Sequence, residues 1–329
     1  MAELVLGVGS SHSPMVTMTG ADWLEWGQRD LKHPMLYTRA GVNLTYQQQL
    51  AAVGETLVDR SSPERCQSGA ERVQAAVARL QAAISEARLD AVVIVGDDQD
   101  EHLLADNLPP FLIYWGDTIT NAGIDDFDQL PALAQHYLPG YREPEGPRTY
   151  PVAADLARHL IAAALAADFD VAASQRLPRE DHGMGHAFGF PLRRLLAAEV
   201  PIVPIMVNTY NPPSQPRATR CAAFGTMVRQ AIDSWPGSAR VGVIASGGLS
   251  HFLVLEDLDR EVLAALERND LATLTAMPEA TYTAGTSEIK NWIVAAAACH
   301  DRRFELIDYV PGYRTPAGSG TGLGFALWT

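Results

Sequence analysis

Apolar runs and regularly spaced apolar positions divide the chain into short strand-like and longer helix-like segments. The runs LVLGVG (4–9) and AVVIVG (91–96) are short and almost wholly apolar, which is typical of strands covered on both faces of a sheet. Residues 63–87 instead have apolar positions three and four apart and begin with Pro63, which predicts one long helix. The two kinds of signal alternate along most of the chain.

This alternation predicts the fold class. Helices that alternate with buried strands pack on both faces of a central sheet, so we expect an α/β fold with a mixed, mostly parallel sheet. The Pro- and Gly-rich segment 138–151 is expected to be a long loop. Further strands are expected at 111–115, 169–174, 202–208 and 240–248, and further helices at 152–167, 218–235, 257–268 and 285–299.

Composition and charge narrow the possible partners. Hydrophobic residues make up 47% and charged residues 19% of the chain, as in ordinary globular proteins. The net charge of −14 repels nucleic acid and anionic membranes. The first residues lack a basic region and a signal-type apolar core. The three cysteines, Cys66, Cys221 and Cys299, are scattered along the chain and predict neither a zinc site nor disulfides. Such cysteines suit a reducing compartment, so we expect a cytoplasmic protein.

Polar groups follow several of the expected strands at their carboxyl ends. His12 follows the first strand in the segment GSSHSP, and the strand at 91–96 runs directly into the acidic segment DDQDE. His251 follows a later strand, and a loop after another strand leads to His182 and His186. Because the carboxyl ends of parallel strands share one edge of a sheet, these groups are expected to meet at one crevice.

Histidines and a carboxylate at such an edge suit a divalent metal ion. Two histidines and one carboxylate form the facial triad that holds Fe(II) and leaves positions open for substrate and dioxygen. The residual positive charge of the bound ion lowers the pKa of a phenol. A histidine after a strand is, however, more often a structural residue than a ligand, and the acids of 97–101 can form a solvated loop. The spacing alone leaves both interpretations open.

Five segments in order resemble a known family. The segments SSHSP, DDxxxxxxxDNLPPF, HAFGFPL, ASGGLSH and GTSEIKNW resemble the class III extradiol ring-cleavage dioxygenases of the protocatechuate 4,5-dioxygenase catalytic-subunit type. Within this superfamily, the chain is most similar to the single-chain 3-O-methylgallate 3,4-dioxygenases. The resemblance implies that residues 1–329 form a single catalytic domain. That domain would use non-haem Fe(II) and O2 to open a catechol- or gallate-type ring. Many enzymes of this size are symmetric, so we also expect a homo-oligomer.

The resemblance implies roles for individual residues. His12 matches the family's first iron histidine. The acid–base histidine lies five residues before a proline, which is His186 when counted from Pro191. The carboxylate ligand follows the GGLSH segment and falls on Glu256 or Asp257.

Four more residues are candidates for contacts with the substrate. His251 fits a role in contacting the substrate or supporting the iron ligands. Thr286 and Ser287 are candidates for binding a substrate carboxylate, although both also suit the cap of the following helix. His182, in the segment DHG, is expected to lie at the pocket wall or on the surface.

Gln99 departs from the family pattern. It stands ten residues before Pro109, where the family has its second iron histidine, and a glutamine carbonyl binds Fe(II) more weakly than imidazole does. The sequence leaves three interpretations of this position open. In the first, Gln99 binds the metal directly or through a water molecule. In the others, a neighbour such as Asp98, Glu101 or His102 takes its place, or the site has lost iron. We favour a working metal site because the resembled subgroup shares the Asp–Gln pair. The alternatives are a metal-poor protein that binds a ligand or partner, and a metal-dependent hydrolase.

Overall fold

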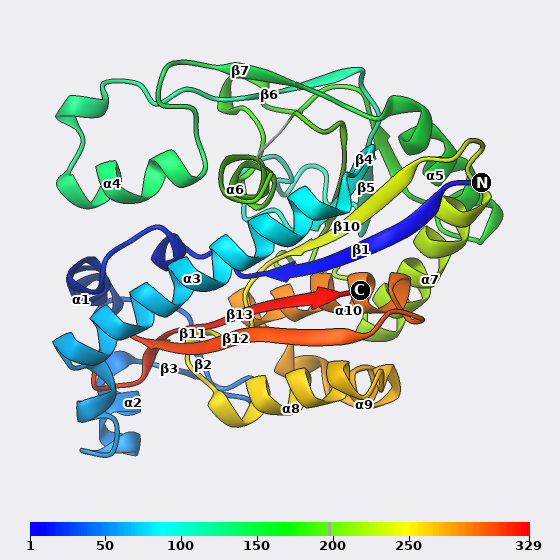
Figure 1. Cartoon of the computed structure of the whole chain (residues 1–329). Coiled ribbons are helices and arrows are strands. Elements are labelled where there is room, and N and C mark those ends of the chain that lie inside the picture. The colour runs from blue at the N-terminus through cyan, green and yellow to red at the C-terminus, as the bar shows by residue number, and fades with distance from the viewer. Residues whose placement is uncertain (197–198) are drawn as a thin grey trace.

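Nine strands form one central sheet in the part of the chain that this computed structural model describes, residues 1–196 and 199–329 (Figure 1). The order across the sheet is β11 (His251–Leu253), β13 (Ser319–Trp328), β1 (Glu3–Ser10), β10 (Arg240–Ser246), β4 (Ala91–Gly96), β9 (Ile202–Val207), β5 (Phe111–Tyr114) and β8 (Ala172–Ser174), with β12 (Phe304–Tyr313) beside β13. The central strands β1, β10, β4 and β9 are parallel, whereas β13 is antiparallel to β1 and β5 is antiparallel to β9. The predicted mixed sheet with helices around it is confirmed.

Helices cover both faces of this sheet. Alternate side chains of β4 point to opposite faces, so Val93 and Val95 join one hydrophobic core and Val92 and Ile94 join the other. The first core includes side chains of α5, α7, α8 and α10, and the second includes side chains of α3 and α6. The helices are α1 (Gly20–Asp30), α2 (Tyr46–Val53), α3 (Pro63–Ala87), α4 (Ala132–Tyr137), α5 (Ala154–Ala166), α6 (His186–Arg194), α7 (Ala218–Ser234), α8 (Glu256–Glu267), α9 (Leu271–Ala276) and α10 (Ile289–Ala298).

The sequence pattern located the long elements well and missed several short ones. The helix expected at 63–87 has those bounds, and the strand expected at 91–96 is β4. The segment 138–151 was expected to be a loop, but it ends in β7 (Arg148–Pro151), which pairs with β6 (Thr118–Asn121). A second small pair, β2 (Leu36–Tyr37) and β3 (Asn43–Leu44), was also missed. None of the helices that the structure describes has the length and apolar character needed to cross a lipid bilayer.

A buried ion pair ties α1 to the turn between the last two strands. The Arg314 guanidinium donates to the two carboxylate oxygens of Asp30 at 2.8 and 3.2 Å, and the Ser319 hydroxyl donates to the same carboxylate at 2.7 Å. The side chains of Arg314 and Asp30 are only 4% and 1% exposed. Each charge therefore depends on the other for compensation.

Replacing Arg314 by methionine is expected to destabilise the fold strongly. Asp30 would then remain buried without its cation, and breaking a buried pair in this way costs about 3–5 kcal/mol. Urea denaturation of Arg314→Met measures the change in the free energy of unfolding. Arg260→Met is the matched control because Arg260 pairs with Glu256 while its side chain is 65% exposed, and it should cost less than about 1 kcal/mol. Equal effects of the two variants would contradict this account.

Candidate functional site

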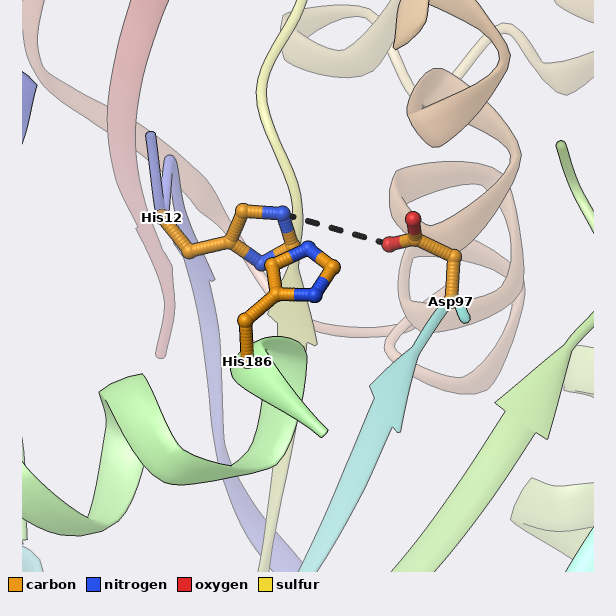
Figure 2. Close-up of side chains that lie close together, drawn as sticks. All are labelled: His12, Asp97 and His186. Carbon is orange, nitrogen blue, oxygen red and sulfur yellow. Dashed lines mark ion pairs between the residues drawn. The ribbon is translucent and has the colours of Figure 1, made fainter. Parts of the chain in front are cut away.

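Three predicted polar segments meet at the carboxyl edge of the parallel strands. His12 follows β1, Asp97 follows β4 and His186 begins α6. One ligand-type atom of each residue lies within 4.8 Å of the others, and Figure 2 shows the two imidazoles beside the carboxylate. The register of β1, β10 and β4 brings their ends level, which is why residues far apart in the sequence converge here.

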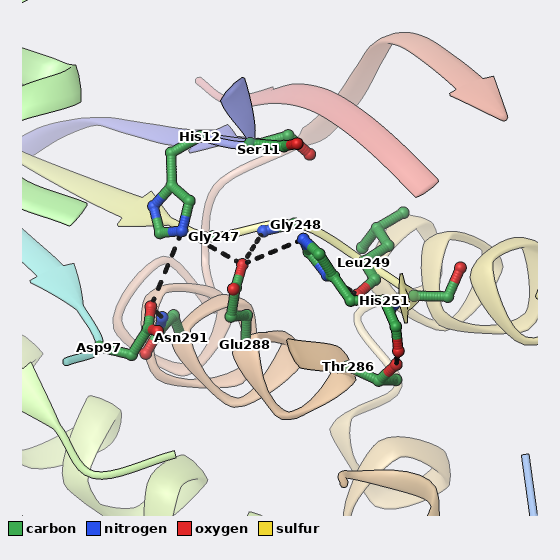
Figure 3. Close-up of polar contacts among 12 residues, drawn as sticks. Ser11, His12, Asp97, Gly247, Gly248, Leu249, His251, Thr286, Glu288 and Asn291 are labelled. Atoms are coloured by element: carbon green, nitrogen blue, oxygen red, sulfur yellow. Dashed lines mark hydrogen bonds and ion pairs between the residues drawn. The ribbon is translucent and has the colours of Figure 1, made fainter. Parts of the chain in front are cut away.

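Glu288 adds a second buried carboxylate to this group. It ends the 3₁₀ turn Ala284–Glu288 that precedes α10. One of its oxygens lies 3.3 Å from Nε2 of His12 and 3.9 Å from Nε2 of His251, and it accepts a hydrogen bond from the Gly248 N–H (Figure 3). Burial opposes charge on Glu288, but His251, His12 and this N–H together hold its pKa well below the usual range. Glu288 is therefore the carboxylate that stays ionised.

Asp97 has the opposite tendency. Its side chain is fully buried, and burial followed by the charge of Glu288 raises its pKa. Two carboxylates near each other in a buried site repel, so ionisation of both is unfavourable unless a positive charge lies between them. A cation bound between Asp97 and Glu288 would relieve this repulsion.

His12 presents a free nitrogen toward these carboxylates. Its Nδ1 lies 2.9 Å from the hydroxyl of Ser246, and its Nε2 is buried without a hydrogen-bond partner among the described residues. Nε2 faces Glu288 at 3.3 Å and Asp97 at 4.0 Å. A metal-binding histidine usually has its other ring nitrogen held by a hydrogen bond, as Nδ1 of His12 is here.

Gln99 reaches the same site through its amide group. The nitrogen donates to Asp97 at 3.1 Å and to Glu288 at 2.9 Å, so this side chain bridges the two carboxylates. Asn291 donates to the other oxygen of Asp97 at 3.1 Å and to the carbonyl of Ser246 at 3.0 Å. With its nitrogen so engaged, Gln99 orients the acids. Its predicted role as a metal ligand stays a prediction.

His186 is held by a carboxylate of its own. Nδ1 of His186 lies 2.7 Å from one oxygen of Glu101, and the backbone N–H of His186 donates to the other oxygen at 2.8 Å. Burial opposes protonation of His186, but Glu101 outweighs it and raises the pKa to about 10. The ring packs edge-on against His12 with centroids 4.5 Å apart. Glu101 thus accepts the Nδ1–H and fixes the ring, and it leaves Nε2 outside this contact.

The predicted carboxylate ligands Glu256 and Asp257 are not at this site. Glu256 accepts hydrogen bonds from Arg260 and from the hydroxyl of Tyr313, each at 3.0 Å, and Asp257 is exposed on the first turn of α8. Neither side chain lines the cavity beside His12, because Glu256 is bound by Arg260 and Tyr313 and Asp257 lies on the surface. Asp97 and Glu288 are the carboxylates that face His12. Glu288 belongs to the segment GTSEIKNW, which the sequence singled out without a role for its acid.

Of the four residues predicted to contact the substrate, one lines the cavity that opens beside His12. His251 lines this cavity, whereas Thr286, Ser287 and His182 do not. The Thr286 hydroxyl accepts from the backbone N–H of His251 at 2.8 Å and donates to its carbonyl at 2.6 Å, so Thr286 positions His251. Ser287 is fully buried. The ring of His182 lies 2.6 Å from the guanidinium of Arg179.

A cavity of about 490 Å³ opens beside the polar group. Its size lies within the range for sites that bind small molecules. One end is lined by His12, Gln99, Glu101, His186, His251 and Glu288. The remaining wall combines aromatic and apolar side chains (Trp26, Tyr137, Leu138, Tyr141, Met184 and Phe252) with polar ones that include Arg29, Arg142 and Arg314. This arrangement suits an aromatic ring whose polar substituents face the imidazoles and carboxylates.

The fold and the site define an α/β protein with an imidazole–carboxylate centre at the sheet edge and an aromatic-walled cavity beside it. The family described as the catalytic LigB subunit of aromatic ring-opening dioxygenase matches residues 56–324. Since this match covers most of the chain, the chain belongs to that family. The resemblance seen in the sequence is thereby confirmed.

Individual relatives match a smaller part of the chain. A gallate dioxygenase of Pseudomonas putida is 32% identical over 156 residues, which are 43% of this chain and 44% of that protein. A 2,3-dihydroxyphenylpropionate/2,3-dihydroxicinnamic acid 1,2-dioxygenase of Cupriavidus necator is 32% identical over 160 residues, 49% of this chain and 43% of the relative. A protein of the same name from Burkholderia vietnamiensis is 37% identical over 101 residues, 31% of this chain and 30% of the relative. Each match therefore spans less than half of the relative.

Asp259 holds the turn that carries His251. Its carboxylate accepts the Ser250 N–H at 2.9 Å, the Ser250 hydroxyl at 2.7 Å and the Tyr309 hydroxyl at 2.7 Å. Complete burial outweighs these hydrogen bonds and raises the pKa of Asp259 from 3.8 to about 6. Protonated Asp259 is thus favoured in the folded state relative to the unfolded chain.

This raised pKa predicts a specific pH dependence of stability. A carboxyl whose pKa is higher in the folded state stabilises the fold below pH 4, and this contribution is lost as the pH rises through about 6. The free energy of unfolding of the wild type, minus that of Asp259→Asn, should therefore fall by about 2 kcal/mol between pH 4 and 7. Urea denaturation of both proteins at each pH measures this difference. A difference that stays constant or rises with pH would refute the assignment.

Proposed function

We propose that this chain is a non-haem Fe(II)-dependent extradiol dioxygenase. It opens the ring of a catechol- or gallate-type diol, 3-O-methylgallate included, and both atoms of O2 enter the product. The observation that carries the proposal is the unpartnered Nε2 of His12 facing two buried carboxylates beside an aromatic-walled cavity. Members of this family are metal-dependent. The whole chain as a single catalytic domain, and its assembly into a homo-oligomer, remain predictions.

The residues present fit a divalent cation. In this proposal His12, Asp97 and Glu288 hold the ion, and Gln99 and Asn291 orient the two carboxylates. One neutral imidazole nitrogen and carboxylate oxygens are suitable ligands for Fe(II). When bound, the ion supplies a Lewis-acidic centre that lowers the pKa of the diol and links the ring electronically to dioxygen. The raised pKa of Asp97 agrees with this assignment, because a cation relieves its repulsion with Glu288.

His186 is proposed as the acid–base group. Its Nε2 is directed to the site because Glu101 binds Nδ1. In this role Nε2 takes the proton of a diol hydroxyl as the substrate binds and returns it to the ring-opened product. A cation nearby would lower the pKa of His186 from about 10, because a like charge disfavours protonation. Glu101 keeps the ring oriented throughout.

Oxygen consumption tests the function directly. The protein is loaded with Fe(II) without air and then mixed with gallate, 3-O-methylgallate, protocatechuate or 2,3-dihydroxyphenylpropionate in aerated buffer. We expect one O2 consumed per ring opened for at least one of these diols, and about one iron per chain. Absence of iron together with retained diol binding would favour a metal-poor binding protein. Turnover that continues without oxygen would favour a hydrolase.

Two histidine variants separate metal binding from proton transfer. His12→Ala should lose the iron, whereas His186→Ala should keep it and lose about 10²–10⁴-fold in kcat. Elemental analysis and oxygen uptake measure the two properties independently. His159→Ala is the control, since His159 is exposed and its ring contacts Ser234. If His186→Ala loses its iron as well, His186 is a ligand and the proposed division of roles fails.

A further inference from the structure

Two arginines line the cavity without an ionic partner. Arg29 lies on α1 and Arg142 follows the turn after α4, and both side chains are exposed. Neither has a carboxylate within 4.0 Å in the ranges 1–196 and 199–329. A third arginine of the cavity wall, Arg314, is already neutralised by Asp30. Arg29 and Arg142 therefore offer positive charge that the protein itself does not use.

A row of aromatic side chains connects Arg29 with the candidate metal centre. The guanidinium of Arg29 lies over the ring of Trp26 at 4.5 Å. Trp26 contacts Tyr137 edge-on with centroids 5.2 Å apart, and Tyr137 contacts Tyr141 at 6.5 Å. The hydroxyl of Tyr141 donates to the carbonyl of His12. A flat ligand that packs along this row has one end near His12 and the other near Arg29.

The charges along the cavity favour a ligand with a negative outer end. The inner end is lined by Glu288 and Glu101, with buried Asp97 behind Gln99, and the whole chain has a net charge of −14. An anionic ligand entering such a field needs positive charge at the entrance, both to approach and to stay bound. Guanidinium groups bind carboxylates in a planar, two-pronged geometry, which a neutral group of the same shape does not offer.

We propose that Arg29 and Arg142 bind the anionic side chain of the aromatic diol whose hydroxyl end lies beside His12 and His186. This inference rests on the proposed function, and it makes the two arginines specificity-determining residues. It also replaces the expected carboxylate contact of Thr286 and Ser287, neither of which lines the cavity. Among the diols of the proposed function, those that carry the acid on a side chain extending from the ring are then favoured.

Binding of two ligands that match in shape and differ in charge tests the proposal without turnover. The full chain, loaded with Fe(II) and kept free of oxygen, is titrated with 3-(3,4-dihydroxyphenyl)propanoate and with its neutral amide. We expect the wild type to bind the acid at least about tenfold more tightly, as for a charge-assisted contact that is partly exposed to water. The double variant Arg29→Met/Arg142→Met should raise the Kd of the acid by about the same factor and that of the amide by less than twofold.

The control variant carries the same change in charge elsewhere. Arg79 is exposed on α3 and does not line the cavity, so Arg79→Met should leave both Kd values unchanged. Circular dichroism verifies that all variants are folded. Added salt should weaken binding of the acid to the wild type more than to the double variant, because it screens the exposed guanidinium groups.

The outcomes separate this proposal from the proposed function. The role of the arginines is refuted if the double variant weakens binding of the acid and of the amide equally, or weakens neither. It is also refuted if the wild type does not bind the acid more tightly than the amide. Both conclusions hold even where oxygen uptake is observed. If binding of the acid requires the arginines but no diol supports oxygen uptake, ring opening is refuted, whereas the role of Arg29 and Arg142 in binding the anion is supported.

Discussion

The burial of Asp97 and Glu288 beside each other is the constraint on which the site depends. Both side chains are almost completely buried, and Glu288 holds its charge while the pKa of Asp97 is raised. Removing two carboxylates from water is expensive unless hydrogen-bond donors and positive charge replace the lost hydration. The amide of Gln99 supplies donors to both, and the imidazole of His12 faces both. A divalent cation would complete the compensation.

This constraint explains why Gln99 is compatible with a metal centre. A histidine at this position would bring one more ligand nitrogen, whereas glutamine brings an amide that donates to two acids at once. In the proposed site, Asp97 and Glu288 both face His12 and would supply oxygen ligands of the kind that Fe(II) accepts. A second carboxylate would then offset the missing imidazole at position 99. Such a site is more negative than the two-histidine, one-carboxylate pattern, which favours cation binding and disfavours anions.

The sequence predicted those parts of the fold and site that depend on local pattern. The apolar run of β4 and the spacing in α3 identified both elements, and His12 and His186 lie together where strand ends were expected to meet. The resemblance placed the carboxylate at Glu256 or Asp257 because both follow the GGLSH segment, whereas the structure brings Glu288 to His12. Only the long-range contacts distinguish them: Glu256 is bound by Arg260 and Tyr313, whereas Glu288 faces His12. No local pattern encodes such contacts. The short strands β6 and β7 were missed for a similar reason, since each pairs with a strand that lies far from it in the sequence.

The position of Glu288 follows from the packing of the helix behind it. Trp292 lies one helical turn after Glu288, on the same face of the chain. Its ring packs against Gly9 of β1, where an added Cβ would lie only 2.3 Å from the indole, and its Nε1–H donates to the carbonyl of Gly247 at 2.8 Å. Only glycine at position 9 allows α10 to approach β1 so closely. The same strand carries His12 just beyond its end, so the contact that seats Trp292 also brings Glu288 to the imidazole. A hydrophobic contact in the core thereby sets the geometry of a charged centre at the sheet edge.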